Sequence, residues 1–355
     1  MPQTVGSGIR KDVATALGAA LLFGASTPLA KALLGDIPPL LLAGLLYLGS
    51  GVGLCAVRLV RDLGWRGAGL TRGEWPWLAA AIALGGVLGP VLLMFGLLRT
   101  AATATSLLLN LEAVLTAVIA WTLFREHTQG RVVLGMILIV AGAVVLSWPS
   151  GAPSTIGLAG PLLIAAACLC WALDNNLTRK VSANDALFLA CAKGLAAGGI
   201  NTGLALMLGA RLPAMPALAG ALAVGLLGYG ISLALFVLAL RGLGTARTGA
   251  YFSTAPFIGA ALAAVLLHEA LTPSLWMAAV LMAAGVWLHL TERHGHRHVH
   301  APLTHTHRHH HDIHHQHDHP GGWDGREPHT HEHQHSPLVH AHPHAPDIHH
   351  RHDHD

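Results

Sequence analysis

The chain has 355 residues, of which 53% are hydrophobic and only 11% are charged, and its mean hydropathy is +0.52. Soluble domains carry about 25% charged residues, so this composition excludes an ordinary soluble protein. Residues 1–293 hold 17 Lys and Arg against 10 Asp and Glu, giving +7, whereas residues 294–355 hold 4 against 8, giving −4. The net charge of +3 therefore does not indicate a nucleic-acid partner.

Ten apolar segments follow one another along the chain, each close to the roughly 20 residues that a helix needs to cross a lipid bilayer. The first is too long for a cleaved secretory signal and is expected to stay in the membrane. No connection between segments is long enough for a soluble catalytic domain, so we do not expect an enzyme. The predicted spans are residues 13–34, 38–58, 75–97, 101–123, 131–148, 159–178, 185–208, 217–240, 245–267 and 273–290.

The second half of this pattern repeats the first. Leu123-Phe124-Arg125-Glu126 returns 143 residues later as Leu266-Leu267-His268-Glu269, and Ala141-Gly142 returns at the same offset as Ala284-Gly285. The first and sixth spans align at an offset of 148. We expect two repeats of five spans, at residues 1–148 and 149–293, an organisation typical of secondary transporters.

Basic residues predict how these repeats lie in the membrane. With the N-terminus in the cytoplasm, inner segments carry 14 Lys and Arg and outer loops carry three. Cytoplasmic loops are enriched in Lys and Arg, so both termini are expected on that side of the bacterial inner (plasma) membrane. Because five is odd, the second repeat enters upside down. The sequence predicts an all-α polytopic protein with ten transmembrane helices as two inverted five-helix repeats.

Two motifs carry a resemblance to a known family. Asn110-Leu111-Glu112-Ala113-Val114-Leu115-Thr116-Ala117, followed by residues 123–126, resembles the N-L-E-P-V-x-T-A signature of EamA-type permeases in the drug/metabolite transporter superfamily. Thr254-Ala255-Pro256-Phe257 is the similar segment of the second half. The resemblance covers residues 12–291 and implies a proton-coupled or facilitated carrier of small metabolites. Ala113 replaces the usual Pro, so a less kinked fourth span is expected.

Polar side chains inside the predicted spans need a function or a partner, because an ionisable group in a bilayer is costly. Asp174 lies in the sixth span beside Asn175, with Trp171 on the same helical face. Asp174 either binds a cation or a proton, or pairs with Arg179 or Lys180 near the helix end.

Lys193, deep in the seventh span, shares a face with Asn201 and is the preferred partner of Asp174, since each would neutralise the other. Glu112, in the fourth span, fits either a functional site or a structural helix contact.

Tyr251 lies in the ninth span and precedes Pro256, which frees a backbone carbonyl one turn earlier. The predicted substrate-binding residues are Asp174, Asn175, Trp171, Lys193, Asn201, Glu112, Asn110 and Tyr251. Glu126 and Glu269 are expected at helix ends, with a structural role.

Residues 294–355 form a tail that holds 24 of the 27 histidines, with few apolar residues. We expect it to be disordered and to bind Zn²⁺, Ni²⁺, Co²⁺ or Cu²⁺, which imidazole suits; proton buffering alone is the alternative. The candidate metal ligands are His296, His298, His300, His305, His307, His309, His310, His311, His314, His315, His317, His319, His331, His333 and His335.

Two classes of function fit this sequence. The preferred one is a secondary transporter that moves a small organic metabolite by alternating access and needs no cofactor, as a monomer or a homodimer. The alternative is a divalent transition-metal transporter, or a permease regulated by metal on its tail. Against metal transport, the predicted spans offer no His in mid-span and only two central carboxylates.

Overall fold

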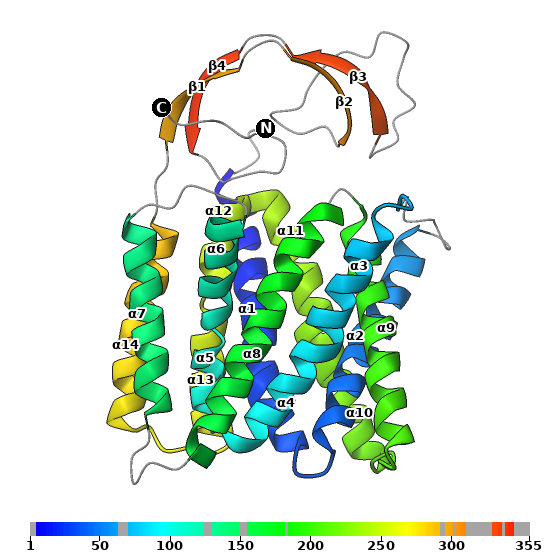
Figure 1. The fold of residues 1–355 in the computed structure, drawn as a ribbon, viewed down its shortest axis with the longest axis vertical. Coiled ribbons are helices and arrows are strands. Elements are labelled where there is room, and N and C mark those ends of the chain that lie inside the picture. The colour runs from blue at the N-terminus through cyan, green and yellow to red at the C-terminus, as the bar shows by residue number, and fades with distance from the viewer. Residues whose placement is uncertain are drawn as a thin grey trace.

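The computed structural model describes residues 5–62, 70–123, 130–148, 155–181 and 184–291, together with four short strands beyond residue 294. Its body is a bundle of helices (Figure 1). Ten helical segments in the described ranges are long and apolar enough to cross a membrane. Each coincides with a predicted span, so the all-α architecture is confirmed.

Several spans are built from more than one helix. The first repeat contains α1 (Val5–Leu33), α2 (Pro39–Asp62), α3 (Trp75–Ala81) with η1 (Ile82–Leu88) and α4 (Gly89–Arg99), α5 (Ala102–Leu108) with α6 (Leu111–Leu123), and α7 (Gly130–Ser147). The second contains α8 (Thr155–Thr178) followed by η2 (Arg179–Val181), α9 (Ala186–Met207), α10 (Met215–Gly225) with η3 (Leu226–Ile231) and α11 (Ser232–Leu243), α12 (Thr245–Phe252) with α13 (Ala255–Leu266), and α14 (Pro273–Leu290).

Both repeats are interrupted at matching places. The third span of each contains a π-helical turn, η1 in one and η3 in the other. The fourth span of each is broken by a two-residue turn, at Leu109–Asn110 and at Ser253–Thr254. The fourth span of the first repeat is thus interrupted without a proline: the Asn110 side chain donates to the Leu107 carbonyl at 2.8 Å at this break.

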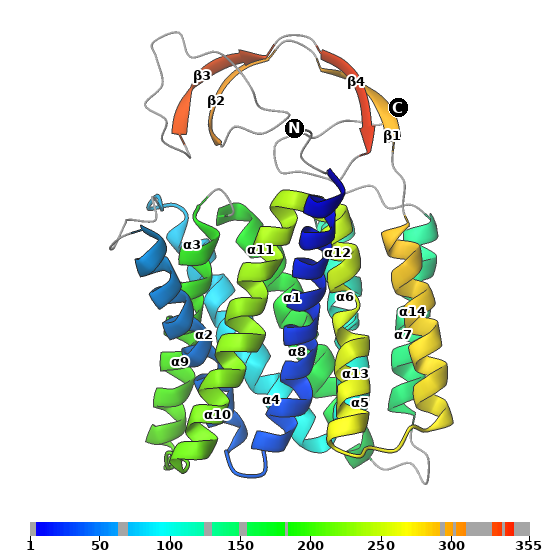
Figure 2. The same ribbon diagram turned by 180° about the vertical axis from the view of Figure 1, so that it is seen from behind.

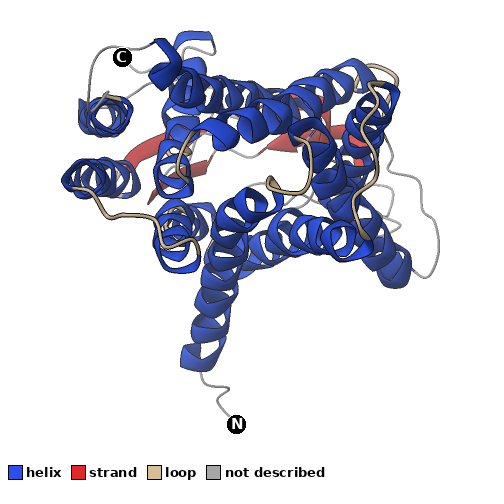
Figure 3. Cartoon of the chain, turned by 90° about the horizontal axis from the view of Figure 1, so that it is seen from below, coloured by secondary structure: helices blue, strands red, loops and turns tan. Residues whose placement is uncertain are grey.

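Close helix pairs join the two repeats. Glycines let α2 and α9 touch backbone to backbone: a methyl group at Gly194 would lie 2.6 Å from the Gly51 Cα atom. The α7–α14 pair is joined in the same way by Gly135 and Gly285, and it stands at one side of the bundle (Figures 2 and 3). Small residues at helix crossings are the usual packing device in membranes.

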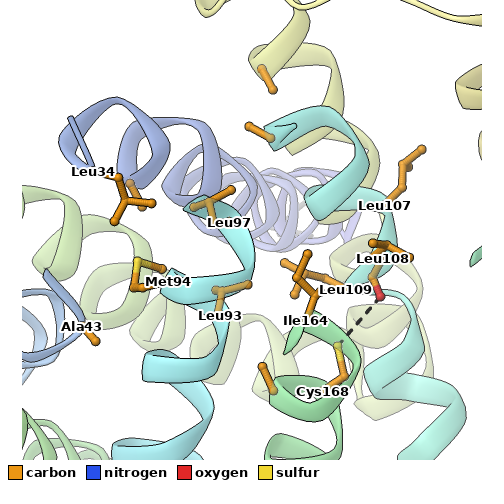
Figure 4. Close-up of a cluster of buried hydrophobic side chains, with 14 of the residues drawn as sticks. Leu34, Ala43, Leu93, Met94, Leu97, Leu107, Leu108, Leu109, Ile164 and Cys168 are labelled. Atoms are coloured by element: carbon orange, nitrogen blue, oxygen red, sulfur yellow. Dashed lines mark hydrogen bonds between the residues drawn. The ribbon is translucent and has the colours of Figure 1, made fainter. Parts of the chain in front are cut away.

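A continuous apolar core fills the bundle between α1, α2, α4, α5 and α8. Figure 4 shows part of it, including Leu93, Met94, Leu97 and Ile164. The Cys168 thiol donates to the Leu108 carbonyl here at 3.8 Å. Ile164, Ala167 and Cys168 of this core belong to α8, the helix that carries Asp174.

Parts of the tail form strands. β1 (Gly295–His300) pairs antiparallel with β4 (Leu338–Pro343), and β2 (Leu303–His309) with β3 (His329–His335). Along these segments His alternates with another residue, a pattern that has the period of a strand. The candidate ligands from His310 to His319 lie outside the described residues.

Candidate functional site

An ion pair inside the membrane joins two spans of the second repeat. Lys193 Nζ, on α9, lies 2.6 Å from each carboxylate oxygen of Asp174, on α8. The Thr178 hydroxyl, one turn along α8, donates to Asp174 Oδ1 at 2.9 Å. The predicted pairing of Asp174 with Lys193 is confirmed, and it supplies each charge with the partner that burial demands.

The π-helical turn η1 packs directly against this pair. Tyr47, on α2, and Trp171, on α8, both donate to the carbonyl oxygen of Gly85, each at 2.9 Å. The Asn201 amide, on α9, donates to the Val87 carbonyl at 3.2 Å. A π-helical turn leaves carbonyls without their usual intrahelical donors, and side chains from three other helices satisfy them here.

Gly85 is required for this approach of α3–η1–α4 to α8. A methyl group at Gly85 would overlap the carboxylate of Asp174. At Gly89, one turn on, a methyl group would lie 2.9 Å from the Trp171 indole nitrogen. The absence of side chains at these two positions lets Asp174 and Trp171 sit against the backbone.

A second carboxylate lies beside the first. Glu112 is in the first turn of α6 and is half-buried. Its Oε1 atom accepts from Asn175 Nδ2 at 2.9 Å, and Asn175 also lies 3.5 Å from the Thr116 hydroxyl. Asn175 is adjacent to Asp174 on α8, so this hydrogen bond links Glu112 to the charged pair. We call this polar cluster the central polar site; its members are Asp174, Asn175, Trp171, Lys193, Asn201, Glu112 and Tyr47.

The structure brings together six of the eight predicted substrate-binding residues and leaves two apart. The Asn110 side chain donates to the Leu107 carbonyl at the break between α5 and α6, and it also contacts the Met282 sulfur at 3.9 Å. Tyr251 uses its carbonyl to accept from the Thr254 hydroxyl at 2.6 Å. No described contact joins the Tyr251 side chain to the central polar site. Both residues mark the broken fourth spans instead.

Sequence reasoning missed Tyr47, Gly85 and Thr178. Tyr47 places one hydroxyl group in an otherwise apolar segment, and Gly85-Gly86 is a pair of small residues; both features are visible in the sequence. A tyrosine, a glycine or a threonine in a membrane helix does not carry the energetic cost of a buried charge. Without the structure, these three residues therefore cannot be told from residues that only pack.

The predicted structural role of Glu269 is supported by its contacts. Its two carboxylate oxygens accept from the backbone amides of Ala102 and Thr103 at 2.7 and 2.8 Å, at the start of α5. A carboxylate at a helix N-terminus satisfies free amide donors and complements the helix dipole. Glu126, its counterpart in the first repeat, lies outside the described residues.

Comparisons with known proteins agree with this architecture. The family model described as "EamA-like transporter family" matches residues 11–148 and again residues 158–291. An uncharacterized transporter of Methanothermobacter thermautotrophicus is 29% identical over 287 residues, covering 76% of this chain and 83% of the relative. A probable amino-acid metabolite efflux pump of Salmonella typhimurium is 28% identical over 303 residues, covering 79% and 95%.

A crystal structure with 20% sequence identity superposes with a TM-score of 0.60, covering 78% of this chain and 95% of that one. At this identity the likeness supports the fold alone. The two family matches cover the two repeats separately, and together they take in nearly all of the helical bundle. The chain belongs to the EamA-like transporter family, within the drug/metabolite transporter superfamily.

Proposed function

We propose that this protein is a secondary transporter that moves a small organic metabolite by alternating access, with the central polar site as its binding site. The observation that carries the proposal is the Asp174–Lys193 pair, held inside the bundle against a π-helical turn. Buried charges between the repeats of a transporter commonly mark the substrate pathway. Glu112, Asn175 and Trp171 complete the set of hydrogen-bonding groups.

The cytoplasmic placement of both termini in an inner membrane is part of the same proposal. The 14 basic residues on one side against three on the other support it. Residues at the start of α1 and the end of α14 lie at the same end of the bundle (Figure 1). The name of the Salmonella relative makes amino-acid metabolites the first class to assay.

The test is metabolite profiling of a deletion strain of the host, complemented with the wild-type gene or with an Asp174→Asn variant. We expect a small set of metabolites to change on deletion, and wild-type but not Asp174→Asn protein to restore them. Normal restoration by an equally abundant Asp174→Asn variant would overturn the assignment of the site.

We propose, as a second function, that the tail binds transition-metal ions. In the described strands the register sets His opposite His: His305 pairs with His333, His307 with His331 and His309 with His329. His296 pairs with His342 and His298 with His340 in the other ribbon. Opposed residues in an antiparallel pair lie about 5 Å apart, a spacing that favours shared imidazole ligands for Zn²⁺, Ni²⁺, Co²⁺ or Cu²⁺.

Metal transport through the bundle is the weaker alternative. Within the described residues, no group of three or more His, Cys, Asp or Glu side chains converges as a metal site. Deleting residues 294–355 separates these ideas. Loss of metal tolerance with unchanged metabolite flux would favour a tail that stores or senses metal, whereas unchanged metal handling would contradict both metal hypotheses.

A further inference from the structure

The contacts between α2 and α9, which join the two repeats, follow one register. Each step of three or four residues forward along α2 is matched by the same step backward along α9. The position between Gly51 and Arg58 in this series holds Cys55 on α2, and the facing position on α9 holds Cys191. The other contacts of the series are Gly44 with Thr202, Leu48 with Gly198, Gly51 with Leu195, Arg58 with Phe188 and Arg61 with Asp185.

The thiols of these two cysteines lie side by side. Both cysteines are free, Cys191 is buried and Cys55 is half-buried, and the two thiols are hydrogen-bonding neighbours. A disulfide needs Cα atoms about 4.4–6.8 Å apart. One turn away, a methyl group at Gly194 would lie 2.6 Å from the Gly51 Cα atom, so the backbones of α2 and α9 approach as closely as such a bond requires.

The packing of this helix pair does not account for the cysteines. By the offset of 148 residues, Cys55 corresponds to Gly203 on α9, and Cys191 corresponds to Ala43 on α2. The symmetry of the repeats places these two small residues in the equivalent layer, on the other side of the contact between Gly51 and Gly194. The same helices therefore pack there without a thiol, and the cysteine pair occurs in one copy only.

The surroundings of the pair act in two directions on its reactivity. Burial disfavours the thiolate, which is the nucleophile, whereas a nearby cation favours it. Arg58 follows Cys55 by one turn of α2, and its guanidinium lies 5.0 Å from the ring centroid of Phe188, one turn from Cys191 on α9. The oxidised product, a disulfide, carries no charge, so it suits an apolar environment better than a thiolate does.

We infer that Cys55 and Cys191 form a redox site, at which a peroxide converts the two thiols into a disulfide that links the two repeats. One thiol loses its proton and attacks a peroxide oxygen; the O–O bond breaks, and a sulfenic acid and hydroxide form. The second thiol attacks the sulfenic sulfur, and the departing hydroxyl group takes up the thiol proton. Two thiols and one hydrogen peroxide thus give one disulfide and two waters. A dithiol reverses the reaction by thiol–disulfide exchange.

The position of this bond suggests what it does. With the N-terminus in the cytoplasm, the pair lies on the cytoplasmic side of the contact between Gly51 and Gly194, in a compartment that normally keeps thiols reduced. The disulfide therefore forms under oxidising conditions, and it holds α2 to α9 on that side. Alternating access requires the repeats to move against each other, so we expect oxidation to slow transport. This effect rests on the proposed function, whereas the bond itself does not.

The first arm of the experiment detects the bond in the purified full-length protein. The protein is treated with hydrogen peroxide, denatured with N-ethylmaleimide to block the remaining thiols, and digested with trypsin. Trypsin cleaves after Lys and Arg, so Cys55 falls in the fragment 32–58 and Cys191 in the fragment 181–193. Mass spectrometry should find these two fragments linked, and dithiothreitol should separate them.

Cys191→Ala, which imitates Ala43 of the first repeat, should abolish the link, whereas Cys170→Ala, on α8, should leave it as in the wild type. Equal melting temperatures of the reduced proteins would establish that both variants fold. Unlinked fragments after peroxide treatment would overturn the inference. A link from Cys55 to Cys168 or Cys170 in place of Cys191 would overturn it as well.

The second arm measures transport of the metabolites whose levels change in the deletion strain, with each protein reconstituted in lipid vesicles. Peroxide should remove most of the transport by the wild type and by Cys170→Ala, dithiothreitol should restore it, and Cys191→Ala should keep it throughout. An equal loss in Cys191→Ala would overturn the regulatory effect of the bond. Failure of the proposed function would appear separately, as unchanged metabolites in the deletion strain, and the linked fragments would then still decide the redox site.

Discussion

The contact between the first span of one repeat and the third span of the other occurs twice with the same backbone arrangement, but only one of the two copies contains a charged pair. Asp174 packs against Gly85 in the second repeat's copy of this contact. By the offsets of 148 and 143 residues, the first repeat's copy is Ser26 against Gly228, and a methyl group at Gly228 would lie 2.6 Å from Ser26 Cβ. By the offset of 148 residues, Lys193 corresponds to Leu45.

This difference separates residues that build the fold from residues that perform the function. The glycine and the adjacent π-helical turn occur in both copies and therefore serve the packing of the third span. The charged pair occurs once, and the fold does not need it, since Ser26 and apolar residues fill the same places in the other copy. The asymmetry therefore points to the second repeat's seam as the site of binding.

The largest effect is expected from breaking the charged pair. Asp174→Ala leaves Lys193 as an unpaired buried charge and should destabilise the protein by about 3–5 kcal/mol, as in other buried pairs. The double variant Asp174→Ser/Lys193→Leu imitates the first repeat and should recover most of that loss. Thermal unfolding of the purified variants measures both. If the double variant is no more stable than Asp174→Ala, the pair has another structural role and the comparison fails.

Adding a methyl group at Gly85 should have the next largest effect. Gly85→Ala must displace the Asp174 carboxylate, and overpacking of this kind typically costs about 1–3 kcal/mol. Gly199→Ala is the matched control, because Gly199 is also in a spanning helix and has no atom within 4 Å of an added methyl group. Melting temperatures compare the two, and equal values would contradict the close approach of η1 to α8.

The hydrogen bonds to the Gly85 carbonyl should show a smaller and non-additive effect. Tyr47→Phe or Trp171→Phe alone leaves one donor in place and should cost about 0.5–1.5 kcal/mol, whereas the double variant leaves a buried carbonyl unsatisfied and costs more than the sum. A double-mutant cycle of unfolding free energies measures the excess. Strict additivity would show that the two side chains do not share this acceptor.

The carboxylate of Glu269 tests the contact at the start of α5. Glu269→Gln weakens two charge-assisted hydrogen bonds to the start of α5 and should cost about 1 kcal/mol. Transport of the metabolites should remain, because the residue lies away from the central polar site. Loss of transport at unchanged stability would assign Glu269 a role beyond the fold.

The smallest effect on stability is expected at Asp185, the residue before the first turn of α9, which lies beside the end of α2. The equivalent helix of the first repeat, α2, has no acidic residue at its start. Asp185 accepts from the Phe188 amide at 2.9 Å and pairs with Arg61. Burial alone raises the pKa of Asp185, but the hydrogen bonds from Arg61 and Phe188 outweigh it and lower the pKa below its ordinary value.

A carboxylate with a lowered pKa stabilises the folded state above its unfolded pKa of about 4, and that contribution is lost as the pH falls through the folded value. Asp185→Asn should therefore lower the free energy of unfolding at neutral pH by less than about 1 kcal/mol, with a small decrease in melting temperature. The melting temperature of this variant should also decrease less than that of the wild type as the pH is lowered. Asp36→Asn, at an exposed loop residue, is the control. Identical acid profiles for Asp185→Asn and the wild type would contradict the pairing.

The sequence predicted the features that carry a large energetic signal. The ten spans follow from hydropathy, the repeat from spaced Glu and Gly residues, and the Asp174–Lys193 pair from the cost of each charge alone. The π-helical turns were not predictable, because Ile82–Leu88 has the composition of any apolar helix. The break at Asn110 was missed because a side-chain amide took the place of the expected proline.

The most direct test of the central claim is a comparison of matched substitutions at Asp174 and Ser26 in one transport assay. The assay measures transport of the metabolites whose levels change in the deletion strain, at equal protein levels in the membrane. The account predicts that Asp174→Asn abolishes transport and that Ser26→Ala leaves it close to wild type. Equal losses at the two positions, or transport that survives Asp174→Asn, would contradict the claim that the charged pair of the second repeat lies at the transport site.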